Sequence, residues 1–202
     1  MGSWMGSSIA VQGTHSVRFV TTRFSPAGVA REGLIRRARV VASGMEIKIR
    51  RAAPADAPII ADFNLRLAEE TEGLRLNPAR VQAGVAALLK DPAKGVYYVA
   101  EVNGVVAGQT MITYEWSDWR NGNLWWIQSV YVKQEFRAQG VFRRLFEHLK
   151  TLAQEQNDVP ALRLYVHADN ARARRSYERL GMSRTQYEVF EMELETEQST
   201  KL

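Results

Sequence analysis

The alternation of apolar and polar residues first becomes regular at Met45, where the chain reads MEIKIRRA. This pattern is typical of a half-buried strand. Residues 53–64 follow with Pro and Asp at the start of a helical pattern, and residues 78–89 predict a second helix with Pro78 in its first turn. The apolar residues that define the first helix are Ile59, Ile60, Phe63 and Leu67. One strand followed by two helices is therefore expected.

The second half of the pattern alternates strands with helices. Aromatic and β-branched residues dominate the segment 95–116, and Asn103-Gly104 in its middle predicts a hairpin of two antiparallel strands. Further strands are predicted over 123–132, 161–168 and 185–194, and helices over 139–156 and 170–181. The strand, helix and strand between 124 and 167 favour a right-handed crossover with parallel strands. We therefore expect an α/β fold, a mixed and mostly antiparallel central sheet with helices on both faces.

The positive charge of the chain is concentrated near its N-terminus. The 202 residues carry a formal net charge of +5, and residues 1–44 contain six Arg and one acidic residue, so the charges of residues 45–202 cancel. A nucleic-acid-binding surface needs a net cationic footprint, so no nucleic-acid partner is expected of the domain. Residues 1–44 lack a sustained apolar period and are predicted to be a flexible extension, either an upstream start or tag or an Arg-rich targeting segment. Residues 45–202 are predicted to form one domain.

Several kinds of chemistry find no support in the composition. The chain contains no Cys, which excludes a thiol nucleophile, a disulfide framework and a Cys-based zinc site. Its three His residues show no metal-ligand spacing, so no metal is expected. No run of about 18 apolar residues is present, so we expect no membrane partner and a cytoplasmic protein.

The junction between the strand 123–132 and the next helix has the features of an anion site. A short polar turn holding Arg137, Gln139 and Gly140 leads into an amphipathic helix. Exposed N–H groups at a helix start can bind a pyrophosphate, and a residue without a side chain at Gly140 lets the backbone approach it closely. Arg137, Arg143 and Arg144 add positive charge nearby. A short Gly turn on its own also suits an ordinary tight turn with solvated arginines.

A second motif follows the next strand, with Asn170, Ala173, Tyr177, Leu180-Gly181 and Met182 at regular spacing. Together the two motifs resemble the GNAT superfamily of acetyl-CoA-dependent N-acetyltransferases. The first motif of that family is Arg or Gln, two residues, Gly, one residue, then Gly or Ala. This sequence conforms to it from Arg137 to Val141 and departs at Phe142.

The resemblance implies that the chain binds acetyl-CoA and transfers its acetyl group to a primary amine, by direct attack in a ternary complex. The implied cofactor-binding residues are Val130, Tyr131, Val132, Arg137, Ala138, Gln139, Gly140, Val141, Phe142, Arg143, Asn170, Ala173 and Tyr177. The strand residues would pair their backbone with the pantetheine arm, and the turn would hold the pyrophosphate. Tyr177 would protonate the leaving thiolate, a role that suits a phenol because it keeps its proton at neutral pH. The alternative is an acyl-CoA-binding sensor or interaction module without turnover.

A base or a water relay must accept the proton of the amine. Many relatives have a Glu where this chain has Gln128, and an amide is not a base. Glu115 is the first candidate, Glu135 the second, and a water relay is the alternative. The candidate acceptor-binding residues are Glu69, Glu72, Trp116, Trp126 and Gln128, and Glu70 is expected to line the same mouth. Carboxylates and aromatic faces attract a cationic amine. The final strand and the aromatic hairpin are also able to pair across a homodimer.

Overall fold

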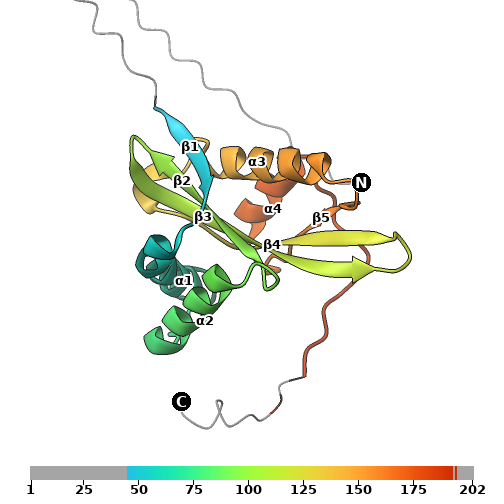
Figure 1. Cartoon of the computed structure of the whole chain (residues 1–202), viewed down its shortest axis with the longest axis horizontal. Helices are drawn as coiled ribbons and strands as arrows, with labels where there is room; N and C mark the ends of the chain where they lie inside the picture. The colour runs from blue at the N-terminus through green and yellow to red at the C-terminus, as the bar shows by residue number, and fades with distance from the viewer. Residues whose placement is uncertain (1–44, 193, 195–202) are drawn as a thin grey trace, which may run out of the picture. The chain divides into compact units, whose positions relative to one another are not determined.

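One five-stranded sheet organises the computed structural model, which describes residues 45–192 and 194 (Figure 1). Its elements are β1 (Ile47–Arg51), η1 (Pro54–Asp56), α1 (Ala57–Glu72), α2 (Pro78–Lys90), β2 (Val96–Val102), β3 (Val105–Ser117), β4 (Gly122–Val132), η2 (Gln134–Phe136), α3 (Val141–Glu155), β5 (Leu162–Arg163) and α4 (Ala171–Arg179). The strand order follows the chain, from β1 at one edge to β5 at the other. Strands β1 to β4 are antiparallel to their neighbours and β5 is parallel to β4, so the predicted mixed, mostly antiparallel sheet is confirmed.

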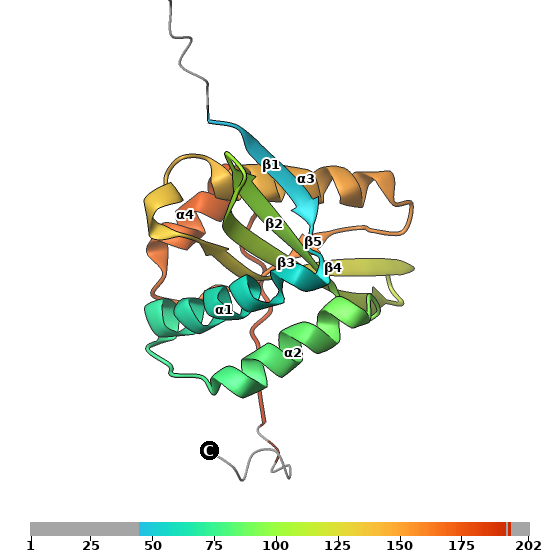
Figure 2. The same ribbon diagram turned by 60° about the vertical axis from the view of Figure 1, so that its left-hand side comes forward.

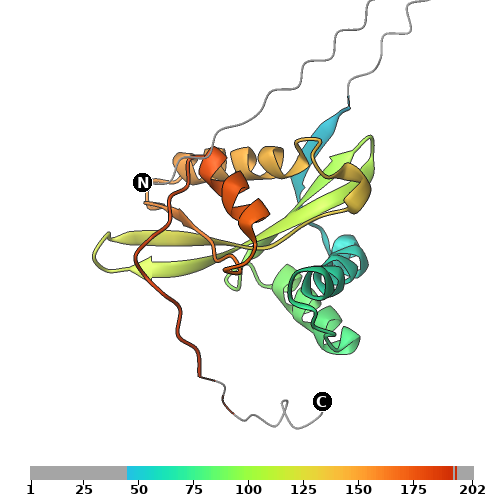
Figure 3. The same cartoon turned by 180° about the vertical axis from the view of Figure 1, so that it is seen from behind.

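Helices cover both faces of the sheet because the strands alternate their apolar side chains. On one face Tyr97 and Val99 of β2 pack against Ile60 of α1 and Val85 of α2. On the other face the core of β2 to β4 packs against α3. Figure 2 shows α1 and α2 on one side and α3 on the other, as the sequence predicted. Figure 3 shows α4 beside α3 on that second side.

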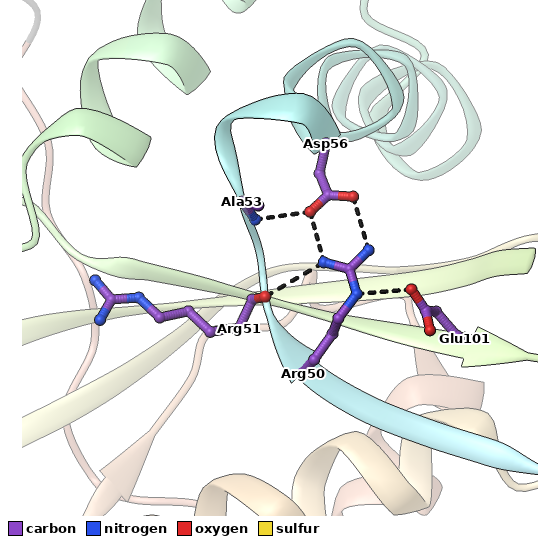
Figure 4. A network of polar contacts seen from close by, with 5 residues as sticks. All are labelled: Arg50, Arg51, Ala53, Asp56 and Glu101. Carbon is purple, nitrogen blue, oxygen red and sulfur yellow. Dashed lines mark hydrogen bonds and ion pairs between the residues drawn. The ribbon is translucent and has the colours of Figure 1, made fainter. Parts of the chain in front are cut away.

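A polar cluster joins β1 to the turn that leads into α1 (Figure 4). The guanidinium of Arg50 donates to both carboxylate oxygens of Asp56, at 2.7 and 2.9 Å, and its Nε donates to Glu101 at 2.6 Å. Asp56 also accepts from the backbone N–H of Ala53 at 2.7 Å. The hydrogen bonds from Arg50, with that of Ala53, lower the pKa of Asp56 against the opposing effect of burial. This cluster fixes the angle at which the chain passes from the sheet to α1.

Two predicted strands differ in the structure. The strand predicted over 161–168 is reduced to Leu162–Arg163, and the strand predicted over 185–194 is wrong in the residues the structure describes. A strand needs a neighbour to complete its backbone hydrogen bonds, and alternation alone does not supply one. β5 pairs with β4 at only two positions, so it offers little ladder to a further strand. The prediction of a flexible extension over 1–44 lies outside the described residues.

Candidate active site

Strands β4 and β5 separate after a short stretch of pairing. Trp125 and Trp126 face Leu162 and Arg163, and in the described part of the chain the ladder between the two strands stops there. The continuation of β4 from Ile127 to Val132 pairs only with β3 on its other side. Apart from the Val132 carbonyl, which accepts from Arg137, its outward N–H and C=O groups are therefore available to bind an extended polar chain, as in the addition of a strand to a sheet edge. Val130, Tyr131 and Val132 lie along this open edge.

A bulge in β4 marks the same place. Gln109 faces Tyr131 and Met111 faces Gln128, so β4 uses one residue more than β3 over this step. Ser129 takes up the extra length with a left-handed φ of 48°. The fully buried Gln109 donates from Nε2 to the carbonyl of Ser129 at 3.3 Å and to Asn64 Oδ1 of α1 at 2.7 Å. A buried amide thus braces the bulge against α1, which keeps the open edge in one conformation.

The turn before α3 has the backbone shape of an anion-binding concavity. Ala138 and Gly140 both adopt left-handed φ values, 62° and 86°, and Gly140 is the N-cap residue of α3. Alternation of left-handed and ordinary residues turns successive N–H groups to one side. The first intrahelical bond of α3 runs from Arg144 N–H to Gly140, so the three preceding N–H groups point out of the helix start. These groups suit a pyrophosphate.

The arginine side chains near this turn already contact carboxylates. Arg137 donates from Nη2 to Glu70 of α1 at 2.5 Å and from Nε to the carbonyl of Val132 at 2.7 Å. Arg143 donates to Glu147 on the next turn of α3 at 2.7 Å. Phosphate recognition at this turn would therefore rest on main-chain N–H groups more than on these side chains.

The second motif forms the start and the inner face of α4. Asn170 caps the helix by accepting the N–H of Ala173 at 3.0 Å, which explains the spacing between these residues. Tyr177 extends from α4 towards α3 and meets the ring of Phe142, with centroids 5.7 Å apart. Burial raises the pKa of Tyr177 above the ordinary value of a phenol. The hydroxyl is therefore held in its protonated, donating form at neutral pH.

A groove of about 450 Å³ runs between α3 and α4 next to this contact. Its lining includes the rings of Phe142 and Phe146, the cations Arg143, Lys150 and Arg179, and Glu147, which pairs with Arg143. Aromatic surface with a net excess of positive charge suits a flat, anionic group such as a phosphorylated nucleoside. The groove begins at the first turn of α3, so it continues from the candidate pyrophosphate site.

On the α1 side of the sheet, Glu115 lies among cationic and aromatic residues. Its carboxylate accepts hydrogen bonds from Trp126 Nε1 and from Arg163, the latter at 3.2 and 3.3 Å. The half-buried ring of Trp126 stacks on Tyr165, with centroids 4.7 Å apart, and also contacts the guanidinium of Arg163. Glu115 is thus an ion-paired carboxylate whose lone pairs are largely engaged, and the ring of Trp126 already has two partners.

The other candidate acceptor residues are separated by the structure. Gln128 donates to the hydroxyl of Thr113 at 2.5 Å on the Glu115 side of the sheet. Trp116 follows Glu115 in β3, so it points to the opposite face and does not share a cleft with it. Glu69 and Glu72 are exposed on the last turn of α1. Glu135 is part of the η2 turn.

Sequence reasoning overlooked the polar contacts that cross from α1 to the sheet. Asn64 and Gln109 were not singled out, nor were Arg163 and Tyr165, and Glu70 had no assigned partner. Gln109 is 45 residues from Asn64, and Arg137 is 67 residues from Glu70, so no local spacing connects them. The available signal was Gln109 itself, a polar residue that directly follows the apolar start of β3.

Candidate metal-binding groups and candidate membrane spans are both absent from the residues that the structure describes. No group of three or more His, Asp and Glu side chains among them is arranged to hold a metal ion. None of the described helices is both long enough and apolar enough to cross a bilayer.

Comparisons with known proteins agree with this geometry. Residues 63–182 match the model of the acetyltransferase (GNAT) family. A possible acetyltransferase from Clostridium difficile 630 is 45% identical, with a TM-score of 0.70 over 74% of this chain and 99% of its own. A predicted acetyltransferase from Clostridium acetobutylicum, solved with acetyl-CoA, is 19% identical and covers 73% of this chain and 96% of its own, with a TM-score of 0.60.

A third solved structure is an aminoglycoside N-acetyltransferase in complex with CoA. It is 15% identical and covers 76% of this chain and 99% of its own, with a TM-score of 0.62, which supports the likeness of fold alone. No curated protein matches the chain.

Proposed function

The chain belongs to the GNAT acetyltransferase family, and from that premise we propose that it transfers the acetyl group of acetyl-CoA to the primary amine of a small molecule. The observation that carries the proposal is the meeting of the two motifs. Phe142, in the helix turn that directly follows the left-handed residues Ala138 and Gly140, contacts the ring of Tyr177. An anion-binding turn and a proton donor are thereby brought to the same end of α3.

The residues present fit acetyl-CoA in three places. The open edge of β4, at Val130 and at the N–H of Val132, would pair with the amides of the pantetheine arm. The N–H groups from Ala138 to Arg143 would hold the pyrophosphate, and the groove between α3 and α4 would receive the phosphorylated nucleoside. Asn170 would lie beside the pantetheine, with its Nδ2 free for a contact because its Oδ1 caps α4.

The reaction follows from these placements. The amine nitrogen attacks the thioester carbonyl carbon, the carbon–sulfur bond breaks, and Tyr177 donates its proton to the departing sulfur. The amine proton must also leave. Glu115 remains a candidate for accepting it, but its ion pair with Arg163 competes for the lone pairs that a proton would need. This pairing favours a water relay past Gln128 and Thr113 as the route of the proton.

A non-catalytic sensor of acyl-CoA is the second candidate function. Two observations support it: an amide, Gln128, stands where many relatives have a carboxylate, and Phe142 departs from the small residue of the family motif. A sensor would bind acetyl-CoA through the same turn and groove without consuming it. Turnover therefore separates the two functions.

The experiment is release of free CoA thiol from acetyl-CoA across a panel of small amines, polyamines, amino acids and aminoglycosides. Tyr177→Phe is compared with the intact chain, and Tyr114→Phe serves as control because Tyr114 lies in β3 and contacts Trp125, outside both motifs. We expect release with one amine class and a loss of about 100-fold in kcat for Tyr177→Phe alone. Binding of acetyl-CoA without release for any amine would support the sensor.

We also propose that two copies associate through the C-terminal segment. Its apolar side chains at Tyr187, Val189, Phe190 and Met192 are between 72% and 91% exposed. A hollow beside β5 is lined by Arg120, Lys150 and Arg163 together with Tyr187 of the segment itself, and the segment also carries Glu188 and Glu191. Each copy thus offers an acidic, apolar segment and a basic surface beside β5, which would complement one another across a two-fold axis.

A further inference from the structure

Glu70 occupies a position that is unfavourable for a carboxylate. It lies in the last turn of α1, where the carbonyl groups and the helix dipole concentrate negative charge, and that turn contains no basic residue. Its partners come from other elements: Arg137 at 2.5 Å and the hydroxyl of Tyr131, which donates at 2.9 Å. Both carboxylate oxygens are engaged, one by each partner.

The charge of Glu70 is maintained by these partners. Burial opposes the charged form, but the hydrogen bonds from Arg137 and Tyr131 outweigh it, and the pKa of Glu70 lies below the ordinary value of a glutamic acid. The carboxylate is therefore ionised at neutral pH and paired with Arg137.

Arg137 is held at several points along its side chain. Its Nε donates to the carbonyl of Val132 at 2.7 Å, its Nη2 donates to Glu70, and its guanidinium carbon lies 5.4 Å from the centroid of the Tyr131 ring. The side chain is 32% exposed. An Arg side chain has many rotamers in solution, and this set of contacts selects one of them.

The residue after Arg137, Ala138, has a backbone conformation of high free energy. Ala138 has a φ of 62°, a left-handed value that an L-residue with a Cβ rarely adopts without support from its surroundings. Arg137 is the residue directly before it, and the N–H groups of the candidate pyrophosphate site follow directly after. A fixed Arg137 therefore limits the freedom of the turn as a whole.

We propose that Glu70 is a positioning residue of the acetyl-CoA site, which clamps Arg137 and thereby sets the turn 137–140 in its anion-binding shape before the cofactor arrives. The inference rests on the proposed binding of acetyl-CoA at this turn. It assigns to a residue of α1, on the acceptor side of the sheet, a role in cofactor affinity without contact to the cofactor.

Electrostatics and positioning predict opposite results when Glu70 loses its charge. Acetyl-CoA is strongly anionic, so removing a negative charge near its site should by itself tighten binding. If Glu70 acts by holding Arg137, the same change loosens the turn and weakens binding. Weaker binding by Glu70→Gln is therefore a signature of positioning that charge alone does not produce.

The test is calorimetric measurement of the Kd of acetyl-CoA for the full chain and its variants. Glu70→Gln should raise the Kd by about tenfold, the size expected for loss of a charged hydrogen bond. Glu69→Gln and Glu72→Gln make the same charge change on the same turn of α1, and Glu147→Gln frees Arg143 from a carboxylate beside the same turn. These three controls should bind acetyl-CoA at least as tightly as the intact chain.

A second variant, Tyr131→Phe, and the KM for acetyl-CoA test the same role of Glu70. Tyr131→Phe keeps the ring under Arg137 but removes the hydroxyl that orients Glu70, and it should raise the Kd in the same direction by a smaller factor. In turnover, Glu70→Gln should raise the KM for acetyl-CoA and leave kcat at saturation close to that of the intact chain. If Glu70→Gln binds acetyl-CoA as tightly as the intact chain or more tightly, the role of Glu70 is overturned but the proposed function is not. If the intact chain does not bind acetyl-CoA, both the role of Glu70 and the proposed function are overturned.

Discussion

The rings of Phe142 in α3 and Tyr177 in α4 meet edge to face, with centroids 5.7 Å apart and planes at 70°. Phe142 is the position at which the chain departs from the family motif, where Gly or Ala is usual. In this structure the larger side chain fills the space between the two helices and supports the residue proposed to protonate the thiolate. The departure leaves the backbone N–H groups of the turn in place and adds an aromatic contact.

Phe142→Leu is therefore predicted to lower kcat by about fivefold, the loss expected for one aromatic pair at about 1 kcal/mol. Leu retains most of the apolar contact but has no ring edge to orient the phenol. The Kd of acetyl-CoA should change by a smaller factor, because the main-chain contacts remain and Phe146 keeps an aromatic surface in the groove. A rise in Kd with unchanged kcat would show that Phe142 serves the cofactor and not Tyr177.

The fold was predictable wherever one element carries its own periodicity. The strands from Ile47 to Val132 and the amphipathic helix α3 were expected within a few residues of their observed bounds, because one face of each is buried in a single layer. The segment 185–192 has the same alternation but no paired neighbour. Its strand was predicted wrongly because the presence of a hydrogen-bonding partner is a tertiary property.

In the candidate site, too, the local features were predictable from the sequence and the long-range contacts were not. The turn at Gly140 and the spacing from Asn170 to Tyr177 are local, so motifs revealed them. The clamp of Arg137 by Glu70 joins residues 67 apart, and the pairing of Glu115 with Arg163 joins residues 48 apart. These contacts depend on how α1 and β5 meet the rest of the sheet, and no single segment encodes them.

The raised pKa of Tyr177 predicts a phenol that ionises above the ordinary value of about 10. The absorbance of tyrosinate, as the difference between the intact chain and Tyr177→Phe across alkaline pH, should show a midpoint above that of free tyrosine. The native state then keeps a proton that the unfolded chain loses, so this group reduces stability only above about pH 10. A midpoint at or below 10 would contradict the burial argument.

The ion pair of Asp56 with Arg50 predicts that the free energy of unfolding falls at acid pH. The hydrogen bonds from Arg50 lower the pKa of Asp56, so its stabilisation is present above the ordinary carboxyl pKa of about 4 and is lost as pH falls through the lower native value. Asp56→Asn should cost about 2 kcal/mol at pH 7 in denaturant unfolding. The difference between the two proteins should shrink below pH 4. Asp62→Asn is the matched control, because its pair with Arg66 is exposed.

Glu115→Gln distinguishes the two routes for the amine proton. If water carries the proton, the amide should preserve most of the hydrogen bonding with Trp126, and kcat should fall by less than tenfold. If Glu115 is the base, kcat should fall by about 100-fold or more. We expect the smaller loss, because Arg163 already occupies the carboxylate. Rate measurements at saturating acetyl-CoA and amine, with pH profiles of both proteins, decide between these outcomes.

Removal of the chain after Arg184 is predicted to abolish self-association and to leave the fold intact. The described residues beyond that point form no helix or strand, so their loss should not disrupt the sheet. Light scattering coupled to gel filtration should give a dimer for the intact chain and a monomer for the truncated one.

Because the chain contains no Cys, the contact between the two copies can be mapped with single Cys substitutions. Val189→Cys in one copy and Val166→Cys in another, at a residue three positions after β5, should form a disulfide-linked pair on mixing. Cross-linking within one chain carrying both substitutions, with a monomeric mass, would show instead that the segment pairs with its own β5 edge.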